Sequence, residues 1–526
     1  MDKFDTILKK YETDMPIATR FPPEPNGFLH LGHAKAAYIN FNLAKHAGGI
    51  CYLRLDDTNP KKEKHDYINS IIEDIAWLEH KPYKITYTSD YFEQIFHHTI
   101  DLIKSGNAYV CELNEEEIRK FRRNNKNSPF RDRNFEESLK LFLEMRDGDH
   151  KENTMCLRLK CSSPTDNPNM KDPVIYRIIF DPHPRTGTLW KIYPTYDYSH
   201  PIVDSIENIT HSLCSIEFRI RNELYSYVPK ILGIYGAPQI EYSRLNMTHT
   251  VLSKRKLTEL IDKQVVAAWD DPRIPTIRGL RRRGYTPDAI NNFCNKIGIS
   301  IGISGKKLLC AVLEDCLRKD LETKAKRIFG IINPLLVRIV NANAQASRNV
   351  IIPNYPIQEG NPNRCIRLGE ELYIEKDDFR TTDDPNFYRL APGKIVRLKH
   401  LGLVRCISFD ETNDEIICVN IELLPDTFKP DSRIKGTIGW VSKIDHIIVT
   451  IREYDHLFPE FCDKNNLIHN ENTLKTYTIL TESSLLGAKA FDKYQLERIG
   501  YFCVDPDSTD NIIMNYTIPL RQNKNK

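Results

Sequence analysis

Two histidines spaced three residues apart stand near the start of a predicted helix. His30 and His33 follow a proline-rich loop, and the helical pattern continues through residues 34–37. This spacing places both imidazoles on one face of the first turn, where main-chain N–H groups and the helix dipole favour phosphate oxygens. Gly32 lies between them and leaves room for a flat adenine or ribose near the backbone. The pair indicates a nucleoside triphosphate site, although two histidines at this spacing also commonly pack or cap a helix.

A second candidate group lies far along the chain. Ser253, Lys254, Arg255 and Lys256 form a short run with one hydroxyl group and several cations. Ammonium and guanidinium groups can stabilise the negative charge that develops when pyrophosphate leaves a triphosphate. Taken alone, such a run is more often a solvated surface. Its interpretation changes when it is considered together with the histidine pair.

The elements around these residues predict a parallel sheet. Strand-like runs at residues 16–21 and 50–55 are each followed by a helical pattern. Asp56 comes directly after the second run, at the carboxyl end where open α/β sheets bind ligands. From about residue 86 the pattern becomes irregular and charged, and after about residue 336 short strands alternate with turns. We therefore expect a nucleotide-binding domain over residues 1–85 and 193–243, an insertion over 86–192, a helical connector over 244–335 and a β-rich region over 336–526.

Composition limits the class of protein. With 526 residues, 40% apolar and 28% charged, the chain is a globular protein of several domains rather than a small module, a fibre or a disordered tail. Thirteen cysteines without a Cys-x-x-Cys pair predict reduced thiols and no zinc site. The sequence lacks a signal-peptide core and any apolar run near 20 residues, so we expect a cytoplasmic protein without membrane contact. Because the net charge is only +3, nucleic-acid contacts must come from local basic patches.

The two motifs together resemble the signature pair of class I aminoacyl-tRNA synthetases, here His30-Leu31-Gly32-His33 and Leu252-Ser253-Lys254-Arg255. Stretches at residues 20–27, 55–60 and 250–257 narrow the resemblance to the glutaminyl/glutamyl subgroup. The resemblance covers nearly the whole chain. It implies a Rossmann-type catalytic domain of α/β class, an inserted acceptor-stem-binding domain, a helical connector that carries the second motif, and two C-terminal β-barrels that bind the anticodon.

The resemblance also implies the reaction. ATP and Mg²⁺ would be used to activate L-glutamine as an adenylate, and the acyl group would pass to the 3′-terminal adenosine of tRNA(Gln). The expected partners are ATP, L-glutamine and tRNA(Gln), and the expected form is a monomer. Two rival interpretations stay open: a glutamyl-tRNA synthetase, which could be nondiscriminating, and a tRNA-binding paralogue that has lost catalysis.

Family positions assign roles around the nucleotide and the amino acid. His30, His33 and Lys254 would share the charge at the reacting phosphate, and Asp56 would bind the substrate α-ammonium. Tyr196 would contact the side-chain amide through its hydroxyl, with Gln239 nearby. The other residues expected to surround ATP are Glu24, Pro25, Asn26, Leu31, Gly32, Ala34, Lys35, Ala36, Ser215, Arg244, Leu245, Leu252 and Ser253.

Cys214 separates glutamine from glutamate in this subgroup. The chain reads Ser212-Leu213-Cys214, as in glutaminyl enzymes, whereas glutamate enzymes typically place an arginine at that position. A desolvated carboxylate needs a cation, while a neutral amide needs hydrogen-bond partners without net charge. Cys214 could instead be a small core residue.

In the β-rich region, Arg364, Gln495 and Arg498 match positions that contact the middle anticodon base, and Lys394, Arg397 and Lys399 form a basic segment. Simple solvation of these surface cations is the alternative. Two positions depart from the family pattern. Leu252 replaces a commoner methionine, a swap of similar volume. Ile220 stands where bacterial relatives carry an acid that reads the acceptor stem, which puts that contact in doubt.

Overall fold

The computed structural model describes residues 3–124, 126–161, 167–299, 308–342, 348–356, 360, 362–430, 433–460 and 468–521. The chain forms two compact units. The first contains Met1–Met247, Leu252–Arg255 and Asn291–Leu308, and the second contains Thr248–Val251, Lys256–Ile290 and Leu309–Lys526. No helix of the described residues is long and apolar enough to cross a membrane.

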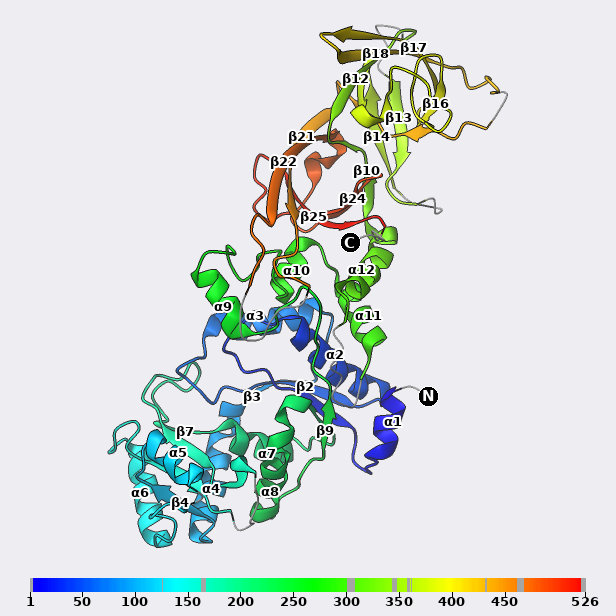
Figure 1. The fold of residues 1–526 in the computed structure, drawn as a ribbon. Coiled ribbons are helices and arrows are strands. Elements are labelled where there is room, and N and C mark those ends of the chain that lie inside the picture. Colours follow the sequence, from blue (N-terminus) through cyan, green and yellow to red (C-terminus); the bar gives the residue numbers. More distant parts are fainter. Residues whose placement is uncertain are drawn as a thin grey trace. The chain divides into compact units, whose positions relative to one another are not determined.

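The first unit is built on parallel strands (Figure 1). Strands β1 (Ala18–Phe21), β2 (Ile50–Leu55) and β3 (Ile85–Tyr87) are joined by helices α2 (Leu31–His46) and α3 (His65–Trp77). Strands β8 (Ser212–Ser215) and β9 (Gln239–Tyr242) are parallel as well, and helices α7 (Tyr196–Ile206) and α8 (Asn222–Leu232) precede them. The main-chain N–H groups of Thr210 and His211 donate to Ala18 O at 3.0 and 3.2 Å, which places β8 beside β1. The predicted α/β class with a parallel catalytic sheet is confirmed.

Buried ion pairs join the two halves of this sheet. Arg20 on β1 and Arg54 on β2 are almost fully buried, and both bond to Asp204 on α7, at 3.0 and 2.6 Å. Burial opposes ionisation of this carboxyl, but the two arginines hold the pKa of Asp204 well below its usual range. Glu207 pairs with Arg54 at the same place. Neutralising both arginines inside the sheet fixes α7 against β1 and β2.

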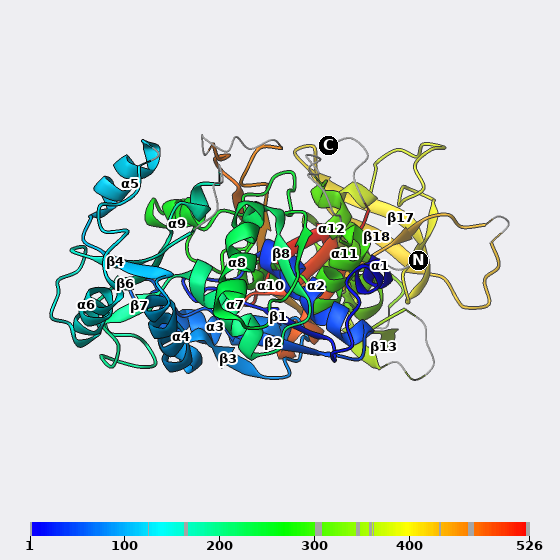
Figure 2. The same ribbon diagram turned by 90° about the horizontal axis from the view of Figure 1, so that it is seen from below.

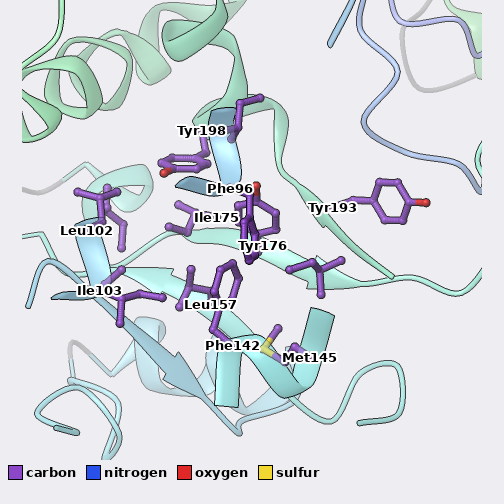
Figure 3. Close-up of a cluster of buried hydrophobic side chains, with 14 of the residues drawn as sticks. Phe96, Leu102, Ile103, Phe142, Met145, Leu157, Ile175, Tyr176, Tyr193 and Tyr198 are labelled. Carbon is purple, nitrogen blue, oxygen red and sulfur yellow. The ribbon is translucent and has the colours of Figure 1, made fainter. Parts of the chain in front are cut away.

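The insertion forms its own antiparallel sheet. Its strands are β4 (Ala108–Cys111), β5 (Cys156–Leu159), β6 (Val174–Ile178) and β7 (Ile192–Pro194), and its helices are α4 (Phe92–Lys104), α5 (Glu115–Arg123) and α6 (Phe135–Asp147). Seen from below, these strands and α6 lie together on one side of the first unit (Figure 2). The apolar core under this sheet includes Phe96, Phe142 and Tyr176, together with Tyr198 of α7 (Figure 3). The insertion therefore shares one core with a helix of the catalytic domain.

The second unit begins with helices and continues as strands. Its helices are α10 (Ile277–Arg283) and α12 (Cys310–Lys324), while α9 (Lys254–Asp262) and α11 (Pro287–Ile297) each contribute residues to both units. One seven-stranded sheet has the order β19-β16-β17-β18-β12-β15-β20, and a second has the order β10-β23-β24-β25-β21-β22-β11. Strands β10 and β11 thus precede the first sheet in sequence but complete the second. Strands begin at Lys326, before the boundary expected at 336.

The remaining bounds are α1 (Lys3–Lys10), β10 (Lys326–Ile328), β11 (Gly330–Ile331), β12 (Pro334–Ile339), β13 (Arg348–Pro353), β14 (Asn363–Leu368), β15 (Glu371–Glu375), β16 (Ile395–Leu398), β17 (Gly402–Thr412), β18 (Glu415–Leu423), β19 (Thr437–Ile438), β20 (Val441–Ser442), β21 (His446–Tyr454), β22 (Leu474–Glu482), β23 (Lys493–Leu496), β24 (Gly500–Val504) and β25 (Ile513–Pro519).

Candidate active site

A cavity of about 660 Å³ lies at the carboxyl ends of the parallel strands in the first unit. The loop after β1, Asp56 after β2, and the end of β8 all contribute to its wall. Parallel α/β sheets bind ligands at this edge, where the strand order reverses. The wall brings together most of the residues that the sequence pointed to: Glu24, His30, Gly32, His33, Lys35, Ala36, Asp56, Tyr196, Cys214, Ser215, Arg244, Leu245 and Leu252.

The two histidines cap the helix that they begin. His30 is the N-cap of α2, and its Nδ1 accepts the N–H of Gly32 at 3.1 Å. His33 Nδ1 accepts the main-chain N–H of His30 at 3.2 Å, and the two rings stack with their centroids 3.9 Å apart. Because both Nδ1 atoms accept hydrogen bonds, each ring carries its proton on Nε2. Capping and ligand binding are therefore compatible functions of this pair.

Both imidazoles are neutral at physiological pH. Burial lowers the pKa of His33 to about 4. Burial, together with His33 and Arg244, lowers the pKa of His30 well below its usual range. The pair consequently offers two neutral N–H donors to a phosphate.

Two glycines make these arrangements possible. A Cβ at Gly32 would lie 2.9 Å from His30 Cε1, so a side chain there would displace the capping ring. A Cβ at Gly27 would lie 2.6 Å from Lys254 Cε, because the lysine stem packs directly over this glycine. The Lys254 ammonium donates to Asn26 Oδ1 at 3.0 Å. Lys254 of the second signature motif therefore contacts the proline-rich loop that leads into the first motif, within the first unit.

Several predicted residues lie outside the cavity wall. They are Pro25, Asn26, Leu31, Ala34, Ser253 and Lys254. Asn26 and Lys254 bond to each other, and Leu31 and Ala34 are chain neighbours of His30 and His33, which do line the cavity. Gln239, on β9, also lies outside the wall, and its Oε1 is buried with no hydrogen-bond partner among the described residues. Lys35 lines the cavity but donates to Ser243 O at 2.6 Å, so its ammonium is engaged with the protein.

The part of the cavity lined by Asp56, Cys214 and Tyr196 combines an acid with neutral groups. Asp56 is buried, and burial together with Glu24 raises its pKa to about 6. Burial raises the pKa of the Cys214 thiol to about 11, so this side chain is uncharged. The ring of Tyr196 stacks on His200 with centroids 4.8 Å apart, and burial lowers the pKa of His200 to about 3.

Arg20 is a cation of the cavity wall, but its charge is already balanced. Its Nε bonds to Asp204 Oδ1 at 3.0 Å, its Nη1 to Leu213 O at 2.9 Å and its Nη2 to Ser212 Oγ at 2.7 Å. A carboxylate substrate would have to compete with Asp204 for this guanidinium. The wall around Cys214 thus suits a neutral side chain better than an anionic one.

Sequence reasoning missed a group at the rim of the cavity. Arg221 Nη1 bonds to Asp197 Oδ1 at 2.8 Å, and its guanidinium lies 5.7 Å from the Tyr196 ring and 5.5 Å from the Phe218 ring. Arg244 pairs with Glu217 close by. The only sequence signal was the alternation of charged and aromatic residues after Ser215. Ile220, singled out in the sequence, is exposed outside the wall.

In the second unit, the cations expected at the anticodon are held by carboxylates. Arg364 is buried and bonds to Glu482 Oε1 at 2.7 Å. Arg498 makes two bonds to Asp378, at 2.6 and 2.8 Å. Lys399 bonds to Glu497 Oε2 at 2.5 Å, and Lys394 pairs with Asp383. Arg397 is exposed and Gln495 is half-buried. Most of the cations expected at the anticodon are therefore paired with carboxylates and are not simply solvated.

Family models of tRNA synthetases match three stretches of the chain. The model described as the catalytic domain of class I tRNA synthetases (E and Q) matches residues 16–323. The chain belongs to this family. Two models described as anti-codon binding domains of the same family match residues 325–424 and 437–505 of the synthetase. The predicted family and the predicted enzyme class, an aminoacyl-tRNA synthetase, are confirmed. As a tRNA synthetase, the enzyme acts on ATP, an amino acid and tRNA.

Named relatives cover nearly all of the synthetase. A "Probable glutamine--tRNA ligase" from Dictyostelium discoideum is 42% identical over 97% of this chain, which spans 66% of that relative. A "Glutamine--tRNA ligase" from Clostridium perfringens is 42% identical over 98% of this chain and 96% of its own length. A solved glutamate tRNA ligase from Elizabethkingia meningosepticum covers 59% of this chain and 70% of its own at 20% identity, and its TM-score of 0.45 adds nothing to the argument.

Proposed function

We propose that this synthetase attaches glutamine to tRNA(Gln). The observation that carries the choice of amino acid is the uncharged Cys214 thiol in a wall where the guanidinium of Arg20 is already paired with Asp204. The sequence prediction of a glutamine–tRNA ligase is confirmed by the relatives of that name, since they match almost the whole of this chain.

In the first half-reaction, a carboxylate oxygen of glutamine attacks the α-phosphorus of ATP. The bond between that phosphorus and the bridging oxygen breaks, and pyrophosphate leaves with the electron pair. The Nε2–H groups of His30 and His33 and the ammonium of Lys254 then stabilise the negative charge that develops on the phosphate oxygens. No side chain acts as a covalent nucleophile, so catalysis consists of positioning and electrostatic stabilisation.

The α-ammonium and the side-chain amide of glutamine are recognised separately. Asp56 accepts the ammonium, since it is buried at the end of β2 and lines the cavity. Tyr196 and Cys214 line the part of the cavity that takes the amide. Family resemblance assigns Gln239 to recognition of the amide. Because Gln239 does not line the cavity, it would act in this role from outside the cavity wall.

Magnesium enters with ATP. Among the described residues, no group of three or more histidine, cysteine or acidic side chains could hold a metal ion. Magnesium usually keeps several waters and binds through substrate phosphates with few protein ligands. The ion is therefore part of the MgATP substrate, and it supplies additional charge stabilisation at the phosphates.

In the second half-reaction, the 2′-hydroxyl of the terminal adenosine attacks the acyl carbon and AMP leaves. The insertion, residues 86–192, binds the acceptor stem, and the two seven-stranded sheets bind the anticodon through the residues around Arg364 and Arg498. The helical connector, residues 244–335, links the two. The enzyme acts as a monomer in the cytoplasm.

ATP–pyrophosphate exchange in the presence of tRNA(Gln) tests the proposal. The enzyme should support exchange with glutamine and much less with glutamate. Exchange with glutamate at an equal or higher rate would identify a glutamyl enzyme, and the absence of exchange with either amino acid would identify a paralogue without catalysis.

A further inference from the structure

His183 lies next to the amino-acid end of the cavity, on the chain between β6 and β7 of the insertion, and it has no role in the reaction just described. Its side chain is buried, with 2% of the residue exposed. The ring packs against Phe92 and Tyr193, with centroids 5.7 and 5.8 Å away. Figure 3 shows Tyr193 at the edge of the insertion core, away from the other labelled rings. The polar ring of His183 therefore packs against two aromatic residues of this core.

The hydrogen bonds of His183 define its protonation state. Nδ1 accepts the main-chain N–H groups of Arg185 and Thr186, both at 3.1 Å. A proton on Nδ1 would face two donors, so the ring is neutral and carries its proton on Nε2. Burial also lowers the pKa of His183. The Nε2–H group points at Asp57 O, at a distance of 2.9 Å.

This bond is one of several that hold the main chain of the loop after β2, where the N–H of Asp56 itself donates to Pro23 O at 3.1 Å. Arg177, on β6 of the insertion, donates from Nη2 to Thr58 O at 3.3 Å. Glu63 accepts the N–H of Asn59 at 2.5 Å through Oε1. Three consecutive residues after Asp56 are thus bonded through their main chains, and two of those bonds come from the insertion.

Asp57 ties the same loop down through its side chain. Its carboxylate accepts the N–H of Ser89 at 2.8 Å and the Ser89 hydroxyl at 2.6 Å. Arg185, two residues from His183, donates to the same hydroxyl at 2.7 Å. Asp57 does not line the cavity, whereas its neighbour Asp56 does. The insertion therefore reaches the cavity wall directly through Arg177, and it also holds the main chain of Asp57, the residue next to Asp56.

We infer that His183 is a positioning residue, which fixes the main chain of Asp57 and thereby aims the Asp56 carboxylate at the α-ammonium of the amino acid. The inference rests on the proposed role of Asp56. Loss of the Nε2–H donor leaves a buried carbonyl without its partner, and the loop can then rotate Asp56 away from the ammonium. The binding of ligands that lack an ammonium should not be affected by this change.

A matched pair of inhibitors tests this inference. L-glutaminol keeps the ammonium and the amide, and 5-amino-5-oxopentanoic acid keeps the amide but lacks the ammonium. The inhibition constants of both are measured against aminoacylation of tRNA(Gln), with the KM for glutamine and for ATP. We expect His183→Ala to weaken glutaminol and glutamine by about tenfold, the scale of one hydrogen bond to a buried group, with less than twofold change for the deamino compound and for ATP.

Two further variants separate positioning from general damage. His183→Gln places an amide N–H close to the original Nε2 and should recover part of the loss. His97→Ala removes an exposed histidine from α4 of the same insertion and should change none of the constants. A uniform loss for all ligands in His183→Ala and His183→Gln, or no loss in either, would overturn the inference.

Asp56→Asn is measured in parallel. It should abolish the preference for glutaminol over the deamino compound. If Asp56→Asn does so and the His183 variants do not, the inference fails while the proposed function stands. If Asp56→Asn leaves the preference unchanged, the ammonium is bound elsewhere and both assignments fall.

Discussion

In the catalytic cavity, His30 and His33 present neutral N–H donors, whereas in the second unit Arg364 and Arg498 are charged donors already bound to carboxylates. The histidines use Nδ1 for capping, and no partner of either Nε2 is recorded in the described part of the chain. Arg498, in contrast, donates two of its five N–H groups to Asp378.

With the roles proposed for these residues, the difference follows from what each region has to bind. A triphosphate brings its own negative charge, so neutral donors can bind it without first losing another partner. A nucleobase is neutral, so a guanidinium that reads it benefits from a counter-ion that sets its direction and balances its charge. The comparison teaches that a cationic residue in the sequence does not by itself mark an electrostatic site.

The largest expected effect is at the adenylation site. Lys254→Ala should raise the activation barrier for adenylate formation by about 3 kcal/mol, which slows the reaction roughly a hundredfold. The reason is that the ammonium acts where charge develops on the departing pyrophosphate. Binding of tRNA should change little. Pre-steady-state rates of adenylate formation check this, with Lys263→Ala as the control, since Lys263 is exposed just beyond α9. Rates within threefold of wild type would show that Lys254 does not stabilise the charge that develops in this step.

A smaller effect is expected in the second unit. Arg498→Ala should weaken aminoacylation of tRNA(Gln) by about 1 to 3 kcal/mol, with less effect on a tRNA already altered at the middle anticodon base. Arg405→Ala is the matched control, because its side chain is equally exposed, at 38% against 39%, and is also paired with an acid. An equal loss of aminoacylation efficiency on normal and altered tRNA would show that Arg498 contacts only the RNA backbone. The effect of Arg364→Ala would be harder to interpret, because this substitution leaves Glu482 buried without its cation.

The smallest effect concerns pH. Burial and Glu24 raise the pKa of Asp56 to about 6, so its charge is present above that pH and is lost as the pH falls through it. The KM for glutamine should therefore rise about fourfold between pH 8 and pH 5.5, with the KM for ATP nearly unchanged. Asp56→Asn should show a high KM without this pH dependence. A KM that does not vary with pH in the wild type would show that Asp56 does not bind the ammonium as a carboxylate.

Much of the first unit follows from local pattern. The run at residues 50–55 is the observed strand β2, and Asp56 lies at its carboxyl end as predicted. Hydrophobic period and a following helix suffice for such elements, because their partners are the next elements in sequence. The motifs themselves contain several of the residues that line the cavity, among them His30, His33 and Leu252.

Contacts between distant residues could not be predicted in this way. Strands β10 and β11 pair with strands more than a hundred residues later, and no local pattern shows that pairing. The pairing of Arg364 with Glu482 and the bond between His183 and Asp57 depend on the fold as a whole. In the sequence, helix capping by His30 is an alternative to ligand binding, yet the two nitrogens of one ring allow both.

We attribute the selection of a neutral amide to two features of the cavity: Cys214 adds no charge, and Arg20 is neutralised by Asp204. Aminoacylation of tRNA(Gln) with labelled glutamine and labelled glutamate, in wild type and Cys214→Arg, tests this claim directly. The wild type should prefer glutamine, because a desolvated glutamate carboxylate without a cation costs several kcal/mol. Cys214→Arg should lower kcat/KM for glutamine and raise the ratio of glutamate to glutamine, without a complete switch. An unchanged ratio in a folded variant, or a wild-type preference for glutamate, would contradict the claim.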